Sequence, residues 1–434
     1  MSIEQERVYT PGPQLYLWYL GDPQTPRLVG DLTLVMNGRG VALQYSREWM
    51  TNGFALSEDL PLLPEARLPR QLDHAVGSVD DARPDRWGER VIRHLERPAR
   101  TAVLDMLYFA GDERSGALGV STHPDRYVPC PRAPLPQLRD VDALHQVVRA
   151  VLDGLPVDEH QRRLLAPGSL GGARPKALIS LEGDAWILKF AEVGYLSEPL
   201  IEHAAMTLAA KTGIVVADTR VITLAAGHAV AVKRFDREAG RRHHVLSADV
   251  ALGAAGSELS YPALAQLLRR RGDPTDGIAL KQMRELFRRV VFNILIDNTD
   301  DHEKNHALLL VTDQQGRQHY RLTPAYDVLP AGLNLGYQAM MVGEHGTLST
   351  VDNALSACMA YGLGYDDACQ EAARVAAVVD HWAAHFAAIG VPQADVVALK
   401  AVIDRPDLLK QRQALRVFAP EHLNTSDESI LEPD

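Results

Sequence analysis

The stretch Asn298-Thr-Asp-Asp-His-Glu-Lys-Asn305 is an unbroken polar segment between two apolar runs. The run before it, Leu286 to Ile296, has helical character, and the run after it, His306 to Val311, has the composition of a strand. Asp300 and Asn305 are five positions apart, the spacing of the carboxylate base and the amide metal ligand in a phosphotransferase catalytic loop. We therefore predict that this segment is a catalytic loop that transfers phosphate from ATP.

Asp327, at the end of Leu322-Thr-Pro-Ala-Tyr-Asp327, is a second candidate metal ligand. Together with Asn305 it offers oxygen atoms, which suit Mg²⁺. His302 could hydrogen-bond a phosphate or orient the loop. Lys304 lies beside the proposed base, where a cation could offset charge in the transition state. Each residue alone also fits a structural role, such as a loop cap, a turn amide or a strand end.

A glycine-rich loop lies far upstream, in Pro167-Gly-Ser-Leu-Gly-Gly-Ala-Arg-Pro-Lys176, and leads into a strand expected over 177–181. Backbone amides without side-chain bulk can approach phosphate oxygens closely, so Gly168 to Gly172 form a candidate phosphate cradle. Paired glycines before a strand are also common in ordinary loops. The glycines alone do not decide between these two roles.

Lys189 lies in the strand that returns from this loop, Ala185 to Phe190, between apolar neighbours. Strand alternation would bury its ammonium group, which then needs a partner and could reach the same phosphates. The helix expected over 198–211 offers Glu198 and Glu202 on one face. We favour Glu202, one turn into the helix, because Glu198 already suits the helix N-terminus.

Two further strands, 215–224 and 228–235, complete a sheet-rich half of the chain. Lys233-Arg234-Phe235 at its end is the candidate hinge against which adenine would bind, and the charged segment Asp236 to His244 has the composition of a hinge or linker that leaves the sheet. The rest of the chain is mostly helical, with helices expected over 259–271, 279–296, 371–390 and 393–403. A sheet-rich half followed by a helical half predicts a two-lobed α+β fold.

Residues 1 to about 125 have the pattern of a small α/β unit. Its expected elements are strands over 14–19, 30–36 and 41–45, and a helix that begins at Pro84. Trp87 in that helix is expected to pack in the core rather than bind a ligand. Five prolines between 121 and 140 indicate a connector, and an amphipathic helix follows over 140–155. The residues 424–434 are an acidic, polar tail.

The composition is that of a globular protein, with 46% hydrophobic and 23% charged residues among 434. This length predicts two or three structural units. The net charge of −11 argues against a whole surface that binds nucleic acid, although a local basic patch stays compatible with it. The three cysteines lack metal or disulfide spacing, so we expect reduced thiols. The N-terminal residues contain no apolar signal core, and the sequence contains no run that approaches the about 18 apolar residues needed to span a membrane. We therefore expect a cytoplasmic protein with no membrane partner.

Taken together, these segments resemble the HipA family of bacterial serine/threonine kinases, the toxins of HipBA toxin–antitoxin modules. The similar segments are 300–305 (catalytic loop, D-x-H-x-K-N), 322–327 (metal-binding L-T-P-x-Y-D), 232–237 (hinge strand, R-F-D-R), 168–176 (phosphate loop), and 30–61 with 112–118 (N-terminal subdomain). Ser169 occupies the position at which the family is autophosphorylated. The resemblance covers nearly the whole chain.

The resemblance implies a protein-kinase-like α+β fold with an added N-terminal subdomain and an all-helical C-terminal lobe. The implied domains are 1–125 (N-terminal subdomain), 126–236 (kinase N-lobe), 237–423 (helical C-lobe) and 424–434 (tail). The implied catalytic residues are Asp300, His302 and Lys304, and the implied Mg²⁺ ligands are Asn305 and Asp327. The implied ATP contacts are Ser169, Leu170, Gly171, Gly172, Lys176, Lys189, Glu202, Lys233, Arg234, Phe235 and His302.

The resemblance also implies partners and regulation. The partner would be a HipB-like helix-turn-helix antitoxin, through which operator DNA is contacted. The substrate would be a translation component, typically an aminoacyl-tRNA synthetase. Autophosphorylation of Ser169 would eject the loop and switch the kinase off, because a phosphate adds a charge of about −1.5 to −2 and competes with the nucleotide phosphates.

Two other functions are compatible with the residues. A non-catalytic nucleotide-binding regulator could act by docking a DNA-binding partner, and loss of the base or metal residues would have favoured it. A small-molecule kinase could share the same phosphate machinery, and it would label metabolites instead of proteins.

Overall fold

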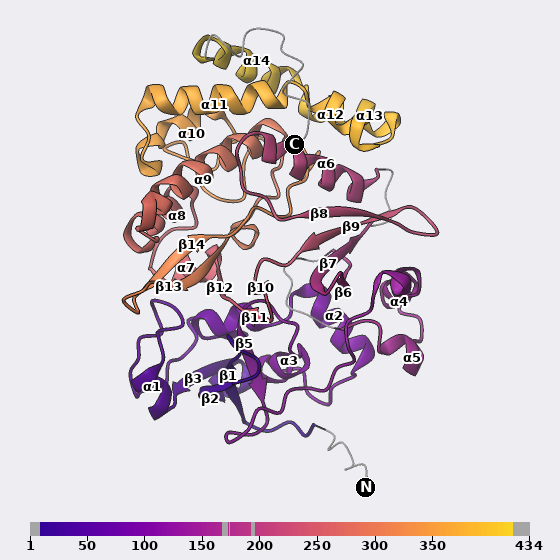
Figure 1. Ribbon diagram of the computed structural model, residues 1–434, viewed down its shortest axis with the longest axis vertical. Helices are drawn as coiled ribbons and strands as arrows, with labels where there is room; N and C mark the ends of the chain where they lie inside the picture. The colour runs from indigo at the N-terminus through magenta and orange to yellow at the C-terminus, as the bar shows by residue number, and fades with distance from the viewer. Residues whose placement is uncertain (1–8, 167–171, 173, 192–195, 420–434) are drawn as a thin grey trace. The chain divides into compact units, whose positions relative to one another are not determined.

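The protein divides into two compact units, each of which contains β-sheet and helices (Figure 1). The computed structural model describes residues 9–166, 172, 174–191 and 196–419. Unit 1 comprises the chain up to Ala173 together with Asp236–His244, and unit 2 comprises Arg174–Phe235 and the chain from Val245 onward. Residues 126–173 thus group with the N-terminal sheet. The expected domains are functional divisions taken from the resemblance, and they stay a prediction.

Unit 1 is built on a five-stranded sheet with the order β4-β3-β2-β1-β5. Its strands are β1 (Gln14–Tyr19), β2 (Arg27–Val35), β3 (Gly40–Tyr45), β4 (His74–Ala75) and β5 (Leu118–Ser121). Leu15 and Leu32 are directly opposite each other in the antiparallel β1–β2 ladder, and both are buried, as period-two alternation requires. The three N-terminal strands expected from the sequence are therefore confirmed.

The helices of unit 1 are α1 (Arg47–Asn52), α2 (Arg86–Leu95), α3 (Val103–Phe109), α4 (Val141–Asp153) and α5 (Glu159–Arg162). Asp85 caps α2, because its carboxylate accepts a hydrogen bond from the Gly88 amide at 2.6 Å. Trp87 is buried, which confirms its expected packing role. The apolar face expected for α4 is also buried, and it consists of Val141, Leu144, Val147, Val148 and Val151.

The segment Asp236–His244 is not the simple linker that its charges suggest. It forms a two-stranded hairpin, β10 (Arg237–Glu238) with β11 (Arg241–Arg242), which belongs to unit 1. The Asp236 carboxylate accepts a hydrogen bond from the Gly116 amide at 2.7 Å, and Arg237 donates to the Gly116 carbonyl at 2.8 Å. The segment is therefore an ordered hairpin rather than an irregular linker, because its charged side chains bond to a neighbouring backbone of unit 1.

Unit 2 begins with a four-stranded antiparallel sheet in the order β6-β7-β9-β8, against which α6 (Glu198–Lys211) packs. Its strands are β6 (Lys176–Leu181), β7 (Asp184–Phe190), β8 (Thr219–Thr223) and β9 (His228–Lys233). β8 starts later than the expected residue 215. The Ala217 amide donates instead to the Ala325 carbonyl at 2.9 Å, and the Ala325 amide donates to the Val215 carbonyl at 2.8 Å. These residues hold the segment that leads to Asp327.

The rest of unit 2 is helical around one small sheet, with the order β12-β13-β14. Its strands are β12 (His244–Ser247), β13 (Ala307–Thr312) and β14 (Gln318–Leu322). Its helices are α7 (Ala248–Ala254), α8 (Tyr261–Arg271), α9 (Ile278–Leu295), α10 (Val351–Ser356), α11 (Tyr365–Val379), α12 (Trp382–Ile389), α13 (Gln393–Ile403) and α14 (Pro406–Leu415). The predicted α+β class is confirmed, but the C-terminal lobe is not all-helical as expected, because the strand-like run at β13 pairs with β12 and β14 in this sheet.

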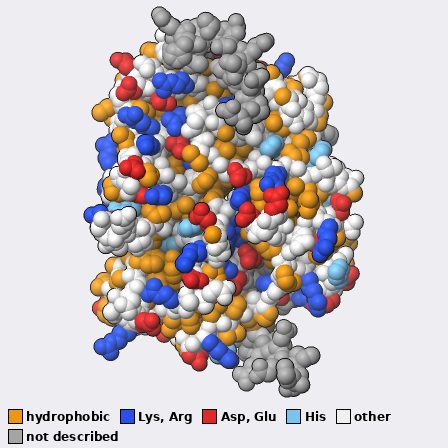
Figure 2. Space-filling view, in the orientation of Figure 1, with side chains coloured by type: hydrophobic (Ala, Val, Ile, Leu, Met, Phe, Trp, Pro, Cys, Tyr) orange, Lys and Arg blue, Asp and Glu red, His pale blue; other side chains and the backbone are white. Residues whose placement is uncertain are grey.

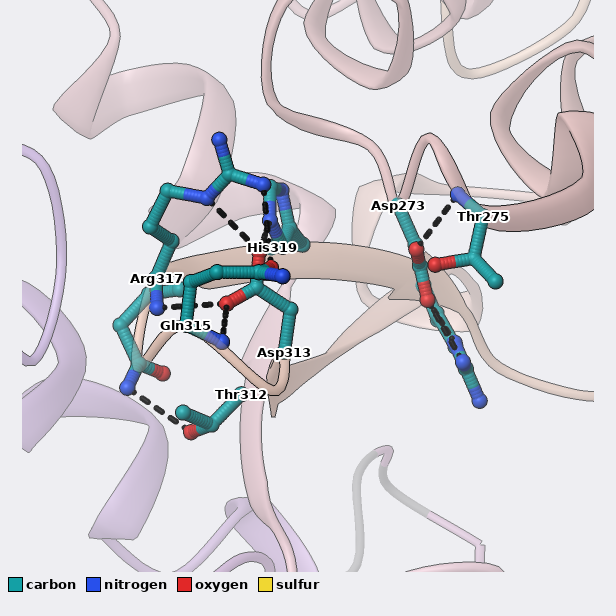
Figure 3. Close-up of polar contacts among 9 residues, drawn as sticks. Asp273, Thr275, Thr312, Asp313, Gln315, Arg317 and His319 are labelled. Carbon is teal, nitrogen blue, oxygen red and sulfur yellow. Dashed lines mark hydrogen bonds and ion pairs between the residues drawn. The ribbon is translucent and has the colours of Figure 1, made fainter.

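The turn of the β13–β14 hairpin is closed by a single carboxylate (Figure 3). Asp313 accepts hydrogen bonds from the backbone amides of Gln315 and Arg317 at 2.9 and 2.8 Å. The side chains of Arg317 and His319 bond to its other oxygen at 2.8 and 3.0 Å. These contacts hold the Asp313 pKa well below its usual range, although burial opposes the shift.

One long helix expected over 371–390 is in fact two, α11 and α12. His381 separates them, because its backbone angles of −99° and 9° interrupt the helical hydrogen-bond ladder. The break directs Trp382 into the core, where its indole donates to Asp404 Oδ1 at 3.0 Å. The apolar periodicity runs through this break, so it could not be seen in the sequence pattern.

The side-chain distribution agrees with the expected globular class. Cys130, Cys358 and Cys369 are buried free thiols, as predicted. Lys and Arg side chains are interspersed with Asp and Glu over the face drawn in Figure 2, so no single-sign charge covers it. Among the described helices, none is long and apolar enough to cross a membrane.

Candidate catalytic site

The predicted catalytic loop follows the buried helix α9 and precedes β13. The Asn298 amide donates to the Asn293 carbonyl at 2.8 Å, which ends the helix and starts the loop. Asp300 is exposed, whereas Asn305 is buried. The Asn305 side-chain nitrogen donates to the Asp300 carbonyl at 3.1 Å. The amide oxygen is therefore the atom that Asn305 can offer to a cation.

Lys189 of β7 lies between two carboxylates from other elements. Its ammonium nitrogen is 2.5 Å from Glu202 Oε1 on α6 and 2.8 Å from Asp327 Oδ1 in the segment after β14. The preference for Glu202 over Glu198 as its helix partner agrees with this contact. Burial lowers the Lys189 pKa, but the two carboxylates outweigh burial and raise it above its ordinary value. Lys189 is therefore a cation at neutral pH.

Two more cations lie near Asp327. Lys176 is directly opposite Lys189 in the β6–β7 ladder, so both side chains are on one face of the sheet. Burial raises the Asp327 pKa, but Lys189, Lys176 and Arg174 outweigh it and hold that pKa well below its usual range. Burial lowers the Arg174 pKa, but the nearby carboxylates, Asp327 above all, have the larger effect and raise that pKa above its ordinary value. The sequence reasoning missed Arg174, although its place between the glycines and Lys176 was a signal.

Asp327 has a strained backbone, with φ of 59°. Non-glycine residues rarely adopt this left-handed conformation, and it persists only where surrounding contacts impose it. Here the parallel bridge between Val216 and Ala325 fixes the chain just before the strained residue. Such strain at a carboxylate beside three cations marks a candidate functional position.

An aromatic pair lies beside this centre, and the sequence reasoning assigned only one of its members. Phe235 stacks on Tyr326 with ring centroids 5.5 Å apart and planes inclined by 30°. The Tyr326 hydroxyl donates to the Lys304 carbonyl at 2.8 Å, so this ring also supports the catalytic loop. The position of Tyr326 immediately before Asp327 was the signal that could have identified it.

The remaining candidate residues have separate surroundings. His302 Nδ1 is 3.2 Å from the Lys304 amide and caps the short 3₁₀ turn Glu303–Asn305, while Lys304 Nζ is 3.9 Å from Asp249. Lys233 Nζ is 2.7 Å from Asp184 Oδ2, and Arg234 is buried. Gly172 has φ of 89°, which favours glycine. The predicted phosphate-cradle residues Gly168, Ser169, Leu170 and Gly171 lie outside the described residues.

The donor set suits a hard cation bound together with phosphates. Asp327 is ionised, because its pKa is depressed, and Asn305 supplies a neutral oxygen. Mg²⁺ typically takes one or two carboxylates from the protein and completes its shell with water and substrate phosphates. Within the described ranges, no cluster of three or more His, Cys, Asp or Glu side chains forms a metal site of its own.

Comparisons with known proteins point in one direction. The family model for the HipA-like C-terminal domain matches residues 168–387. Y4mE of Sinorhizobium fredii, named as a kinase, is 27% identical over 382 residues, which are 78% of this chain and 83% of that protein. Y4dM of the same species, also named as a kinase, is 29% identical over 163 residues, or 34% of this chain and 37% of that protein.

A solved structure has a similar fold over most of the chain. It is a chain of the complex of Shewanella oneidensis MR-1 HipA, HipB and operator DNA. The alignment has a TM-score of 0.62 at 17% identity and covers 92% of this chain and 97% of that one. This likeness confirms the fold class expected from the sequence.

Proposed function

The chain belongs to the HipA family of kinases, and from this premise we propose that it is an ATP- and Mg²⁺-dependent protein serine/threonine kinase. The observation that carries the proposal is the position of Lys189 between Glu202 and Asp327. In protein kinases a strand lysine that binds phosphates is held by a helix glutamate, and an aspartate nearby binds Mg²⁺. The same three residue types meet here, on a strand, a helix and a loop.

The proposed chemistry is transfer of the γ-phosphoryl group to a serine or threonine hydroxyl. Asp300 would accept the hydroxyl proton while the hydroxyl oxygen bonds to phosphorus and the bond from phosphorus to the ADP oxygen breaks. Lys189, with Lys176 and Arg174 nearby, would hold the phosphates. Asn305 and Asp327 would hold Mg²⁺, which neutralises phosphate charge when bound.

The nucleotide base would bind at the end of β9. Residues Lys233 to Phe235 form the proposed hinge, and the stacked rings of Phe235 and Tyr326 supply an apolar face for adenine. Gly168 to Gly172 would cradle the phosphates, and His302 and Lys304 would assist from the catalytic loop. The proposed N-lobe and C-lobe are 126–236 and 237–423, with 1–125 as the added subdomain.

The test is transfer of radiolabelled phosphate from ATP in the presence of Mg²⁺, to the protein itself or to proteins of a bacterial lysate. We expect transfer by the wild type and a loss of at least about 100-fold in Asp300→Ala, with the fold retained by circular dichroism. Asp313→Ala, a change at the far end of the adjoining hairpin, is the matched control and should keep its activity. Full activity in Asp300→Ala would overturn the assignment of the base.

The same assay separates the other two functions. A regulator that only binds nucleotide would show ATP binding without transfer to any acceptor. A small-molecule kinase would label metabolites and leave proteins unlabelled. The fully assembled set of Lys189, Glu202 and Asp327 favours a catalyst over a regulator.

We extend the proposal to regulation and partners on the strength of family membership. The partner would be a HipB-like antitoxin, the target an aminoacyl-tRNA synthetase or another translation component, and Ser169 the autophosphorylated residue. Phosphoproteomics after induced expression, with Asp300→Ala as the control, would identify the target. A phosphosite at Ser169 in the wild type alone would support the regulatory part.

A further inference from the structure

Asp301 directly follows the proposed base and has the opposite surroundings. Whereas Asp300 is exposed, the Asp301 side chain is 4% exposed. Its Oδ2 atom receives three hydrogen bonds: from the Tyr261 hydroxyl at 2.7 Å, the Asn293 side-chain nitrogen at 2.8 Å and His306 Nε2 at 2.8 Å. Hydrogen bonds to an ionised acceptor are stronger than neutral ones. A buried carboxylate with three donors on one oxygen is a strong anchor.

The three donors come from three different elements. Tyr261 is the first residue of α8, Asn293 lies near the end of α9, and His306 immediately precedes β13. The Tyr261 hydroxyl also lies 3.1 Å from the Asp301 backbone carbonyl. Asn293 in turn accepts a hydrogen bond from the Asn298 side chain at 3.2 Å, at the start of the loop. The network therefore holds the loop at both of its ends and at its centre.

The anchor acts on a peptide group that matters for the site. The carbonyl that accepts from the Asn305 amide belongs to Asp300, and its peptide group ends at the Asp301 nitrogen. Because a peptide group is planar, fixing Asp301 also fixes the direction of this carbonyl. That direction determines how Asn305 presents its oxygen. The exposed base and the buried metal ligand are thus both positioned through one anchored peptide.

We propose that Asp301 is a positioning residue, which clamps the catalytic loop onto α8, α9 and β13 and thereby places Asp300 and Asn305. The inference rests on the proposed function, because it assigns the clamp a purpose in phosphate transfer. There is little slack behind the loop, since the cavity lined by Asp301, Asn305 and His306 has a volume of about 10 Å³, room for one water at most. Removing the anchor would open that space and let the loop shift.

The test compares Asp301→Asn, which keeps the shape and removes the charge, with Tyr261→Phe, which keeps the ring and removes one donor. We expect kcat to fall about 10-fold in Asp301→Asn and a few-fold in Tyr261→Phe, the range typical of residues that orient a metal ligand. The KM for ATP should stay within about twofold, while the Mg²⁺ concentration for half-maximal activity rises. kcat and the Mg²⁺ dependence should change because the loop positions the proposed base and Asn305. The KM for ATP should not change because Lys189, the proposed phosphate ligand, lies on β7 and outside the loop.

Asp313→Asn is the matched control, because Asp313 also binds a histidine and two backbone amides but closes the opposite end of the same hairpin (Figure 3). It should lower the Tm without changing kcat or the Mg²⁺ dependence. Equal kcat losses in Asp301→Asn and Asp313→Asn would show a merely structural role and overturn the proposal. An unchanged Mg²⁺ dependence in both Asp301→Asn and Tyr261→Phe would overturn it as well.

Hydrogen exchange of the 298–305 amides provides a readout that does not depend on activity. Exchange should be faster in Asp301→Asn and Tyr261→Phe than in the wild type, and unchanged in Asp313→Asn. If the wild type transfers no phosphate, the proposed function fails, and exchange alone then decides whether the clamp exists. Unchanged exchange in both clamp variants would overturn the clamp even in an active enzyme.

Discussion

Lys189 and Lys233 lie on neighbouring strands of one sheet, and each contacts a carboxylate, yet their surroundings differ. Lys233 pairs with Asp184 at 2.7 Å, with side chains that are 36% and 50% exposed. Lys189 is 12% exposed and lies between Glu202 and Asp327, which come from a helix and a loop. An exposed ion pair of the first kind contributes little, because water screens both charges. The second kind exists only because three elements converge on it.

The difference shows what a lysine at the end of an apolar strand run signifies. Both lysines follow such a run, and the sequence assigned both to the nucleotide site. A charged group that is buried away from water costs free energy unless an opposite charge pairs with it. Of the two lysines only Lys189 is buried in this way, so only Lys189 requires the carboxylates that a helix and a loop bring to it. The place of Lys233 in the hinge stays a prediction, which rests on the backbone of residues 233–235.

Removing the buried lysine should have the largest effect. We expect Lys189→Met to reduce phosphate transfer by at least about 100-fold, because a preorganised charge at the phosphates is lost. Stability should fall by about 3 to 5 kcal/mol, since Glu202, which is buried, would lose the cation that pairs with it. Transfer assays and chemical denaturation measure the two effects. Activity within threefold of the wild type would contradict the assigned role of Lys189.

A pH series sharpens the comparison through Asp327. Burial raises the Asp327 pKa, but the effect of Lys189 and the neighbouring cations is larger and holds that pKa well below its ordinary value. A carboxyl with a depressed pKa stabilises the fold above about pH 4, and this contribution is lost as the pH falls below that value. Burial raises the pKa of Glu202 and Lys189 opposes that shift, so in Lys189→Met the ionised Glu202 carboxylate destabilises the fold until acid protonates it.

The expected result is therefore a Tm difference between wild type and Lys189→Met that is largest near pH 7 and shrinks toward pH 4. Thermal unfolding followed by circular dichroism at several pH values measures it. Lys233→Met provides the reference, because its exposed pair should give a small and pH-independent difference. A constant gap for Lys189→Met would mean that the carboxylates find other partners.

How far the sequence could predict this site depends on the range of each interaction. The spacing of Asp300 and Asn305 and the apolar strand around Lys189 are local patterns, and each correctly marked its element. Glu202 could be selected because helix geometry distinguishes the first turn from the second. The stacking of Tyr326 on Phe235 joins residues 91 positions apart, and no local pattern encodes it.

The fold shows the same limit. Strands and helices with clear periodicity were predicted to within a few residues, for example α6 over Glu198–Lys211. The late start of β8, at Thr219 instead of residue 215, could not be foreseen, because Ala217 pairs with Ala325 from a distant segment. The break at His381 was hidden since the apolar pattern continues through it. Tertiary contacts decided each of these cases over local preference.

Glu202→Gln should have an intermediate effect. The variant keeps the size of the side chain but weakens its hold on Lys189, which would then be drawn toward Asp327 alone. We expect transfer to fall about 10-fold, mainly through kcat, as for other residues that orient a functional group. Glu198→Gln, one turn earlier on the same helix, is the matched control and should stay within about twofold. Equal losses in the two variants would indicate a general effect of negative charge at the helix start.

Lys233→Met should have the smallest effect and is the strictest test of the comparison. The ammonium group of Lys233, at the end of β9, contacts Asp184 at the start of β7, and both side chains are partly exposed, so its removal leaves no buried charge behind. The backbone of residues 233–235, which the proposed hinge uses, is unchanged by the substitution. We expect transfer, the KM for ATP and the Tm to stay near wild-type values, the first two within about twofold. A tenfold rise in the KM for ATP would instead mean that the Lys233 side chain leaves Asp184 to bind nucleotide. The two lysines would then differ only in the state without ATP.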